Sequence, residues 1–512
     1  MTDKPRSPDI MPLRVYDTRS REKRELSTLE DGRVSMYVCG ITPYSPSHLG
    51  HARCYLAFDV VHRWLEASGY DVDYVQNFTD IDDKILDISD SEGVDYSVVA
   101  NRNIDDYLEA MDTMNVLRAD HYPRVTETIP EIIDMISTLE GKGHAYVGDD
   151  GVYFEIDTAP GKFGQLTGQT LEMVRAGAGG RVADTGSGKR DHRDFALWKL
   201  AKPGEPSWES PWGDGRPGWH IECSAMSLNH FGEQFDIHGG GHDLRFPHHE
   251  AEIFQSECCT ESEPVVGYWM HNGFVNVDGE KMSKSLGNFW TIRDAFEHHE
   301  PLALRYALLS VPYRNPIDLT PEFLEDAATH FNRLVGAYGD SLSSDSESET
   351  DLSGASERFA AAMDDDFNTR AAMIEIQAVV SSANGSDVAV WLERHAGDVL
   401  GLLPPSEDVM AGLAQADSAR AEVAEGSTRC WPSARARGIP RTGPAPTRSA
   451  TRLLRWESSS RTGQTARPGA WTDYSSSETS TEGWLLMRLR MLELITPIEP
   501  TTTTREKKIA AQ

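Results

Sequence analysis

Lysine is scarce in this sequence. Only 12 of its 49 basic residues are lysine, and 81 acidic residues bring the formal net charge to −32 over 512 residues. An acidic surface repels nucleic acid, so the composition by itself argues against a nucleic-acid partner. An acidic, lysine-poor surface also suits concentrated salt, which screens like charges over a few ångströms. The charge therefore indicates either a protein that avoids nucleic acid or one from a halophile.

Long apolar runs are missing as well. No segment approaches the roughly 18–20 apolar residues that a membrane helix needs, and the polar N-terminus lacks the apolar centre of a signal peptide. The six cysteines are scattered, which argues against a disulfide framework and for buried thiols or metal ligands. We therefore expect a soluble, cytoplasmic protein with no membrane part, whose length suggests about three or four domains.

The N-terminal part has the pattern of an α/β domain. Residues 34–39 predict a buried strand, 51–67 a helix, and the apolar residues around Tyr74 a second strand. Strand, helix and strand at this spacing indicate a βαβ unit and a parallel sheet. Farther on, an amphipathic helix from Ile129, a hairpin around Asp149–Gly151 and a glycine-rich stretch suggest an insertion between two halves of this domain.

Two strand patterns follow, at 235–241 and 268–279, and helical patterns then dominate from about 292 to 340 and from 357 to 403. The intervening stretch 341–356 is rich in Ser, Asp and Glu, as flexible linkers are. The later part of the chain is therefore expected to be all-α.

The composition changes abruptly near residue 427. Nine arginines lie between Arg429 and Arg467, where Glu457 is the only acid, so the first 426 residues carry about −39. One interpretation is a disordered basic tail that touches nucleic acid. The other is translation out of frame in a GC-rich gene. We assign no functional residue to this segment.

Two short motifs suit phosphate chemistry. His48-Leu49-Gly50-His51 lies between the first strand and its helix, where nucleotide phosphates bind in doubly wound sheets. Lys281-Met282-Ser283-Lys284-Ser285 follows a predicted strand and turn, and its two lysines suit a developing pyrophosphate charge. Either motif alone is also compatible with an ordinary capped or solvated loop.

A third group has the chemistry of metal ligands. Cys39 follows the first strand, Cys223 lies in GWHIECSAM, and His248 and Glu252 have the i, i+4 spacing of one helical face. Thiolate, imidazole and carboxylate all bind zinc. His249 and Glu250 are rivals for the ligand roles, and inert buried thiols beside a surface His–Glu pair are the alternative.

These motifs and their surroundings resemble the cysteinyl-tRNA synthetases, a family of class I aminoacyl-tRNA synthetases. HLGH and KMSKS are the two signatures of the class, and MDDDFNT (363–369) is particular to the helical domain of this family. The likeness runs from about residue 14 to 403, with Leu49 in place of the usual Ile and Arg370 where Pro is frequent. The other matching stretches are MYVCGITPYSPSHLGHAR (36–53), NFTDIDDKI (77–85), RPGWHIECSAMS (216–227), FDIHGGGHDLRFPHHEAEIFQS (235–256) and YWMHNGFVNVDGEKMSKSLGNF (268–289).

The resemblance implies a Rossmann-like class I catalytic domain with an inserted connective subdomain, followed by an all-α helical bundle. It implies ATP-dependent ligation of L-cysteine to tRNA(Cys) through a cysteinyl-adenylate, by a monomer. The implied segments are the two catalytic halves (14–119 and 206–290), the insertion (120–205), a helical stem-contact region (291–340), a linker (341–356), a helical tRNA-binding domain (357–425) and an atypical tail (426–512).

The resemblance also implies roles for individual residues. One Zn²⁺ per subunit is held by Cys39, Cys223, His248 and Glu252, and Mg²⁺ accompanies ATP. The catalytic residues are His48, His51, Lys281 and Lys284. ATP binds His48, His51, Gly239, Gly240, Asp243 and Lys284, and the cysteine substrate contacts Thr79, Trp219 and His238.

Zinc explains how cysteine is selected without an editing domain. A metal coordinates a thiolate readily, whereas the hydroxyl of serine is far harder to ionise. Two rival functions share the motifs. One is a cysteine ligase that acts on an amino-sugar acceptor, and the other is a catalytically disabled RNA-binding relative.

Overall fold

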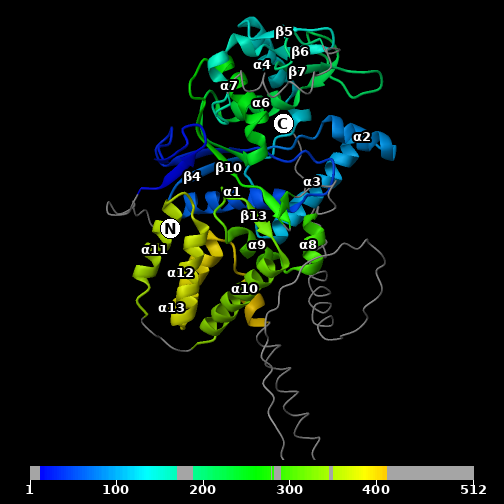
Figure 1. Ribbon diagram of the computed structural model, residues 1–512. Coiled ribbons are helices and arrows are strands. Elements are labelled where there is room, and N and C mark those ends of the chain that lie inside the picture. Colours follow the sequence, from blue (N-terminus) through cyan, green and yellow to red (C-terminus); the bar gives the residue numbers. More distant parts are fainter. Residues whose placement is uncertain (1–11, 170–187, 278, 282–289, 345–349, 412–512) are drawn as a thin grey trace, which may run out of the picture. The chain divides into compact units, whose positions relative to one another are not determined.

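The computed structural model describes residues 12–169, 188–277, 279–281, 290–344 and 350–411 (Figure 1). Lys284, the glycine-rich stretch 170–187 and the predicted tail 426–512 therefore lie outside the described residues. None of the helices described is long and apolar enough to cross a membrane.

A four-stranded parallel sheet positions the candidate site. Its strands are β3 (Arg33–Val38), β4 (Asp71–Gln76), β9 (Phe235–Gly241) and β10 (Val266–Asn272), in the order β10-β9-β3-β4. Helix α1 (Leu49–Ala67) leads from β3 to β4, and α7 (His248–Thr260) leads from β9 to β10. The chain thus turns in opposite directions from β3 and from β9, which creates a crevice at their carboxyl ends. The predicted βαβ unit and parallel sheet are confirmed.

A second, antiparallel sheet is inserted between β4 and β9. Its strands are β5 (Ala145–Val147), β6 (Gly151–Phe154), β7 (Phe195–Leu200) and β8 (Gly215–Pro217), in that order. The first two form the hairpin predicted around Asp149–Gly151. Strand β8 lies beyond residue 205, so the inserted sheet extends past the predicted end of the insertion. The helices of this part are α2 (Asp83–Glu92), α3 (Tyr96–Thr113), α4 (Ile129–Gly141) and α6 (Trp219–Phe231).

Helices dominate the chain after the catalytic region, as predicted. They are α8 (Ile292–His298), α9 (Pro301–Leu309), α10 (Pro321–Leu342), α11 (Ser353–Asp364), α12 (Thr369–Ser382), α13 (Ser386–Leu392) and a π-helical turn, η6 (Glu393–Val399). In Figure 1, α11 to α13 form the yellow group of helices. Because α10 ends at Leu342 and α11 begins at Ser353, helices occupy both ends of the predicted linker.

Helices α2, α3 and α6, strands β7 and β8 and two shorter elements were not predicted. Strand β13 (Ile317–Leu319) pairs in parallel with β11 (Val275–Val277), which also pairs with β12 (Glu280–Lys281). Hairpin β1–β2 (Arg14–Asp17 and Glu22–Glu25) is rich in charged residues. Three-residue strands and charged hairpins carry too little apolar alternation to be recognised locally. Their pairing is decided by distant partners.

The MDDDFNT motif forms one of these distant connections. Asp366 has a positive φ of 68°, and its carboxylate accepts hydrogen bonds from Tyr16 N–H, Tyr313 O–H and Arg314 Nε, at 2.7–3.0 Å. Asp is among the non-glycine residues that tolerate this backbone conformation best. The motif therefore joins hairpin β1–β2 and the loop after α9 to the helices α11 and α12.

Candidate functional site

The four predicted metal ligands meet at the carboxyl edge of the central sheet. Cys39 directly follows β3, Cys223 lies in the second turn of α6, and His248 and Glu252 lie one turn apart on α7. Each residue is at most 4% exposed, and one donor atom from each lies within 4.8 Å of the others. Cys39 and Cys223 thus face each other in one buried cluster, although they are 184 positions apart in the chain.

The separations between these donors fit a tetrahedral zinc ion. Cys39 Sγ lies 3.6 Å from Cys223 Sγ and 3.6 Å from Glu252 Oε1, and His248 Nε2 lies 3.2 Å from Glu252 Oε1. Bond lengths of about 2.3 Å to sulfur and about 2.1 Å to nitrogen or oxygen place tetrahedral donors about 3.4–3.8 Å apart. The two separations from Cys39 lie in this range and the His248–Glu252 separation is about 0.2 Å shorter, so the cluster could hold a metal ion.

The two rival ligands differ in their surroundings. The Glu250 carboxylate accepts backbone N–H bonds from Gly164, Leu166 and Thr167, so it anchors a loop and is not part of the cluster. His249 Nε2, in contrast, lies 3.3 Å from Cys39 Sγ, and it forms with Cys39, His238 and Glu252 a second group of four donors. The two groups share Cys39 and Glu252, and only the predicted group contains two thiols.

Burial keeps the donors uncharged in the absence of a cation. Burial raises the pKa of the Cys39 thiol and of the Glu252 carboxyl well above their ordinary values. Burial also lowers the pKa of His248 well below its ordinary value and that of His238 to about 3. A divalent cation reverses these tendencies for the groups that it binds, because ligand atoms must be deprotonated.

These buried histidines predict that acid destabilises the metal-free protein. Each ring has a folded-state pKa below its unfolded value near 6.5, so the unfolded chain takes up more protons as the pH falls and stability decreases. The raised pKa values of four carboxyls, Glu222, Glu252, Glu300 and Asp366, act in the opposite direction, but the five most deeply buried histidines outnumber them. These histidines are His51, His238, His248, His249 and His271.

The measurement is thermal unfolding after removal of metal by a chelator. The midpoint temperature of unfolding is expected to decrease as the pH is lowered from 7 to 5.5. This dependence on pH should be weaker in His271→Gln. Replacing the exposed His192 instead should leave the dependence unchanged. A midpoint independent of pH over this range would contradict the argument.

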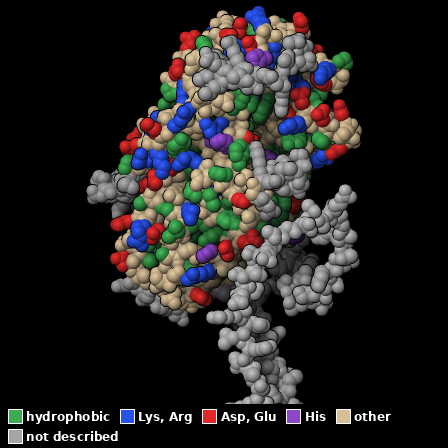
Figure 2. Space-filling model, in the orientation of Figure 1, with side chains coloured by type: hydrophobic (Ala, Val, Ile, Leu, Met, Phe, Trp, Pro, Cys, Tyr) green, Lys and Arg blue, Asp and Glu red, His purple; other side chains and the backbone are tan. Residues whose placement is uncertain are grey.

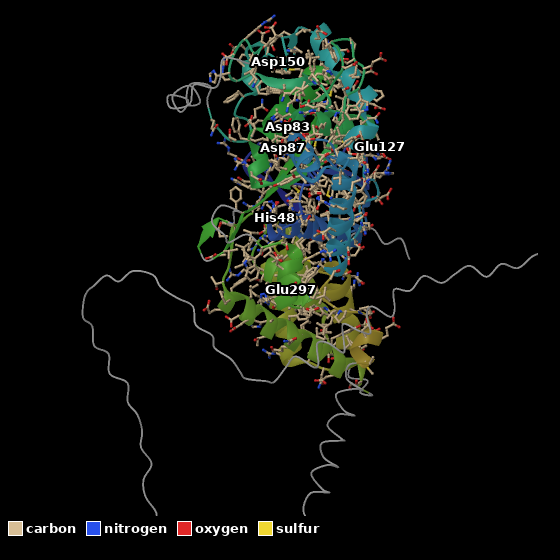
Figure 3. The ribbon with its side chains drawn as sticks, turned by 90° about the vertical axis from the view of Figure 1, so that its right-hand side faces the viewer. His48, Asp83, Asp87, Glu127, Asp150 and Glu297 are labelled. Carbon is tan, nitrogen blue, oxygen red and sulfur yellow. The ribbon has the colours of Figure 1, made fainter. Side chains whose placement is uncertain are left out.

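The HLGH motif forms the N-terminus of α1, after the carboxyl end of β3. His48 Nδ1 accepts the N–H of His51 at 3.3 Å, and His51 Nδ1 accepts the N–H of His48 at 3.4 Å, so the two rings form a capping box. The rings stack with centroids 3.7 Å apart. Figure 3 shows His48 between α2, which carries Asp83 and Asp87, and α8, which carries Glu297.

This cap determines where each imidazole carries its proton. An Nδ1 atom that accepts a backbone N–H is unprotonated, so the neutral ring has its proton on Nε2. Burial, and then the neighbouring His48, lower the pKa of His51 well below its ordinary value, which favours the neutral ring. The motif therefore presents Nε2–H donors beside the positive end of the helix dipole, an arrangement suited to phosphate.

The three predicted substrate contacts border the metal cluster. Thr79 Oγ1 donates to the buried Glu222 carboxyl at 3.2 Å, next to Cys223 in the sequence. Trp219, which is 37% exposed, stacks on His248 with ring centroids 4.5 Å apart. His238 Nε2 lies 3.4 Å from Cys39 Sγ. All three thus lie beside the four-donor cluster.

The glycines predicted to approach the nucleotide also have a packing role. A Cβ on Gly239 would lie 2.3 Å from the Phe58 ring of α1, and one on Gly240 would lie 2.9 Å from the His249 ring. Both separations are shorter than van der Waals contact permits. Internal packing therefore requires glycine at 239 and favours it at 240, whether or not a nucleotide approaches.

Replacing Gly239 by alanine is expected to lower the free energy of unfolding by about 1–3 kcal/mol, the usual effect of overpacking a core. Phe58→Leu in the same chain should restore part of this loss. The matched control is Gly336→Ala in α10, where a Cβ meets nothing within 4 Å. Urea denaturation measures the stability. Unchanged stability together with a raised KM for ATP would instead indicate a role in nucleotide approach.

The remaining predicted ATP contacts are only partly described. Asp243 lies on an exposed 3₁₀ turn, η4 (His242–Arg245), between β9 and α7. Lys281 is the last residue of β12, and Lys284 and the rest of KMSKS lie outside the described residues.

A buried hydrogen-bonded chain beside the cluster was not predicted. His249 Nδ1 lies 2.8 Å from His271 Nε2, and His271 Nδ1 lies 2.8 Å from Thr18 Oγ1. These contacts hold the orientation of the imidazole that faces Cys39. The sequence contained one indication of this hydrogen-bonded chain. Trp269 and His271 are two residues apart on a predicted strand, so they share one face of it, but the sequence does not show which residues pack against that face.

Comparisons with known proteins show which sequences this chain resembles. Residues 25–329 match the family of tRNA synthetases class I (C) catalytic domain. Over 366 residues the chain is 51% identical to a cysteine–tRNA ligase of Dehalococcoides mccartyi, covering 71% of this chain and 79% of that one. Over 417 residues it is 46% identical to a cysteine–tRNA ligase of Laribacter hongkongensis, covering 80% of this chain and 90% of that one.

Solved structures of other synthetases share the fold. A Mycobacterium tuberculosis methionyl-tRNA synthetase in complex with methionyl-adenylate has a TM-score of 0.53 at 16% identity, covering 68% of this chain and 81% of that one. An Agrobacterium radiobacter LeuRS–tRNA–LeuAMS complex has a TM-score of 0.55 at 11% identity, covering 75% and 86%. The predicted class I α/β fold is confirmed.

Proposed function

The chain belongs to the cysteinyl-tRNA synthetase family, and from this premise we propose how its residues carry out the reaction. It is an aminoacyl-tRNA synthetase that charges tRNA with cysteine in an ATP-dependent ligation. The finer proposal is that a cysteinyl-adenylate forms, that tRNA(Cys) accepts the amino acid, and that zinc selects the thiol. The buried four-donor cluster carries this proposal, because it lies at the sheet edge that also bears the histidine cap of α1.

We place one Zn²⁺ per subunit on Cys39, Cys223, His248 and Glu252. Bound there, the ion supplies a Lewis acid that prefers the soft sulfur of cysteine to the hydroxyl of serine. The residues of the chain exclude water and surround the substrate. Burial of the four donors excludes water, the Trp219 ring forms a wall against His248, and Thr79 and His238 complete the surroundings of the substrate.

We place ATP across the carboxyl ends of β3 and β9, with its adenine near Gly239, Gly240 and Asp243. The Nε2–H groups of His48 and His51 donate to the phosphates at the positive end of α1. Lys281 and Lys284 stabilise the charge that develops on pyrophosphate, and Mg²⁺ enters with ATP. These groups hold and polarise the phosphates. Positioning of the reacting groups and stabilisation of charge are the main contributions of a protein to reactions at phosphorus.

The bonds exchanged follow from these positions. The carboxylate of cysteine attacks the α-phosphate in line, and pyrophosphate leaves. The terminal ribose hydroxyl of tRNA then attacks the carbonyl carbon of the adenylate, and AMP leaves. Cysteine is thereby joined to tRNA through an ester bond.

We further propose that the helical segments 291–340 and 357–425 contact tRNA(Cys), with a linker between them. The catalytic halves 14–119 and 206–290 bind the small substrates, and the insertion 120–205 connects them. Lys and Arg side chains are interspersed with Asp and Glu on the face that Figure 2 shows, so tRNA contacts must come from local basic groups and not from the net charge. A cytoplasmic monomer is the expected form.

The acceptor assay tests the function. Cysteine-dependent ATP–pyrophosphate exchange is measured without acceptor, and transfer of labelled cysteine is then measured to tRNA(Cys) and to an amino sugar. We expect exchange together with transfer to tRNA(Cys). Transfer to the amino sugar alone identifies the rival ligase, and absence of exchange identifies a disabled relative.

The acidic composition leads to a separate proposal, adaptation to concentrated salt. The first 426 residues carry about −39, and repulsion among surface carboxylates weakens as salt screens it. We expect the thermal unfolding midpoint to rise when KCl is raised from about 0.1 M to about 1 M, where the Debye length shortens from about 10 Å to about 3 Å. A midpoint that falls or stays constant over this range would contradict the proposal.

A further inference from the structure

A second cluster of metal-ligating side chains lies apart from the catalytic cluster. Asp73, His121 and His230 each place one donor atom within 4.8 Å of the others. None of the three has a part in the proposed reaction. The group consists of two imidazoles and one carboxylate, a donor set that holds divalent transition metals and leaves coordination positions open.

Backbone hydrogen bonds place two of the three ligands on the outer edge of the central sheet. Asp73 is the third residue of β4, the edge strand. His121 lies on the segment beside β4, where its N–H donates to the Tyr74 carbonyl at 3.2 Å and its carbonyl accepts the Gln76 N–H at 3.0 Å. Because the sheet holds both backbones, the separation between the two side chains has little freedom.

The third ligand comes from the end of a helix. His230 lies in the last turn of α6, the helix that also carries Cys223 in its second turn. The carbonyl groups at a helix C-terminus make this end the negative pole of the helix dipole, which favours a bound cation. A metal ion here would fasten the end of α6 to the edge of the sheet.

Both imidazoles approach the same carboxylate oxygen. His230 Nε2 lies 3.0 Å from Asp73 Oδ1, and His121 Nε2 lies 4.0 Å from the same oxygen. Donors about 2.1 Å from a metal are about 3.0 Å apart at right angles and about 3.4 Å apart in a tetrahedron. The His230–Asp73 separation equals the right-angle value and is also that of a hydrogen bond. The His121–Asp73 separation is about 0.6 Å longer than the tetrahedral value, so the exposed His121 side chain has to shift toward Asp73 for the three groups to share an ion.

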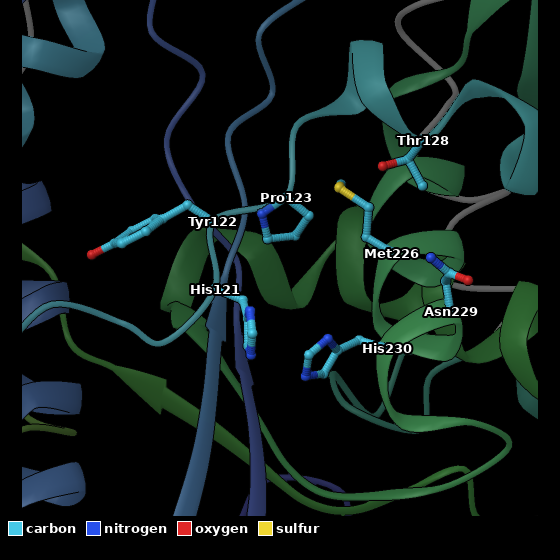
Figure 4. Close-up of a pocket in the computed structure, with 7 residues that line it drawn as sticks. All are labelled: His121, Tyr122, Pro123, Thr128, Met226, Asn229 and His230. Atoms are coloured by element: carbon cyan, nitrogen blue, oxygen red, sulfur yellow. The ribbon is translucent and has the colours of Figure 1, made fainter. Parts of the chain in front are cut away.

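Open coordination positions need space, and the structure provides it. His121 and His230 line a cavity of about 270 Å³ together with Tyr122, Pro123, Thr128, Met226 and Asn229. Figure 4 shows the two imidazole rings facing each other at one side of this cavity, and their centroids are 4.5 Å apart. Thr128 and Asn229 contribute further polar groups to the lining of this cavity.

We propose that Asp73, His121 and His230 form a second divalent-metal site, for a borderline ion such as Zn²⁺, with water from the cavity completing the coordination. The side chains are 31%, 55% and 26% exposed, so the ion exchanges with solvent and binds more weakly than one in the buried cluster. The site does not depend on the proposed function, because it shares no residue with the catalytic cluster.

Metal stoichiometry of the full-length protein tests the site. The protein is equilibrated with Zn²⁺ in small excess, separated from free metal and analysed by elemental mass spectrometry, and affinity is measured by calorimetric titration. Wild type is expected to bind two ions and His230→Gln one, with the affinity of the second site weakened by at least about 100-fold, the upper end of the effect of losing an outer-shell partner. His121→Gln is the second variant, because its 55% exposed side chain can be replaced without disturbing the core.

Two further variants separate the sites. The control His192→Gln removes an exposed histidine that lies 3.2 Å from Asp191. Among the described residues His192 belongs to no group of three metal-ligating side chains, so this variant should still bind two ions. Cys223→Ser should lose the ion of the catalytic cluster and retain the one lost in His230→Gln. Equal stoichiometry and affinity in wild type, His121→Gln and His230→Gln would overturn the proposal.

Discussion

Replacing Cys223 by serine is expected to remove zinc from the catalytic cluster and to abolish cysteine-dependent ATP–pyrophosphate exchange. The Cys223 sulfur lies 3.6 Å from that of Cys39, and serine offers a hydroxyl that does not ionise at neutral pH. A site built to bind one polar group rejects an analogue without that group by about 10⁴–10⁵. We therefore expect the exchange rate with cysteine to fall by about 10⁴–10⁵-fold, to the level measured with serine.

The matched control is Cys54→Ser. Cys54 is a buried thiol on α1, 8% exposed, and it does not belong to either group of four donors. Its replacement should leave zinc content unchanged and lower only the stability. Circular dichroism checks that both variants fold. Unchanged zinc content and unchanged exchange in Cys223→Ser would refute the catalytic metal site.

Replacing Asp59 by alanine is expected to lower the free energy of unfolding by about 3–5 kcal/mol, because it leaves a buried arginine without its counter-charge. Asp59 on α1 is fully buried and accepts hydrogen bonds from Arg63 Nε at 3.0 Å and from Arg305 Nη2. Arg305 is also fully buried, and its other N–H groups donate to carbonyls of Met114, Asn115 and Leu400. The carboxylate thus balances a charge that fastens the later helices to the catalytic domain.

Urea denaturation measures this effect, and limited proteolysis reports whether the helical region separates first. The control is Glu30→Ala, which breaks the exposed ion pair Glu30–Arg33 and should cost at most about 1 kcal/mol. Asp59→Leu combined with Arg305→Met should be less damaging than Asp59→Ala alone, since it removes both buried charges. Similar stability of Asp59→Ala and Glu30→Ala would contradict the argument.

Much of the fold was accessible from local patterns. The strand at 235–241, the helix from Ile129 and the hairpin around Asp149–Gly151 appear as predicted, because apolar periodicity and turn residues act over a few positions. The hairpin β1–β2, strand β13 and the full extent of the inserted sheet were missed. Their strands are short or charged, and pairing with distant segments stabilises them.

The candidate site divides in the same way. Residue types and the i, i+4 spacing of His248 and Glu252 indicated the metal ligands, and the resemblance to a family selected among the rivals. For the hydrogen-bonded chain from His249 through His271 to Thr18, the sequence offered only the alternation of Trp269 and His271, because the last contact spans 253 positions. The packing of Gly239 against Phe58 likewise depends on which helix covers the sheet.

The sequence by itself determined the chemistry that this protein can perform, because thiols, imidazoles and lysines in signature order are local properties of the chain. Only the tertiary structure decided which of these groups meet. The strand order β10-β9-β3-β4 brings Cys39 beside Cys223, and the end of α6 against the edge of β4 brings His230 to Asp73. The physical reason is that such distances depend on the path of the whole chain, which the packing of the sheet and its helices sets.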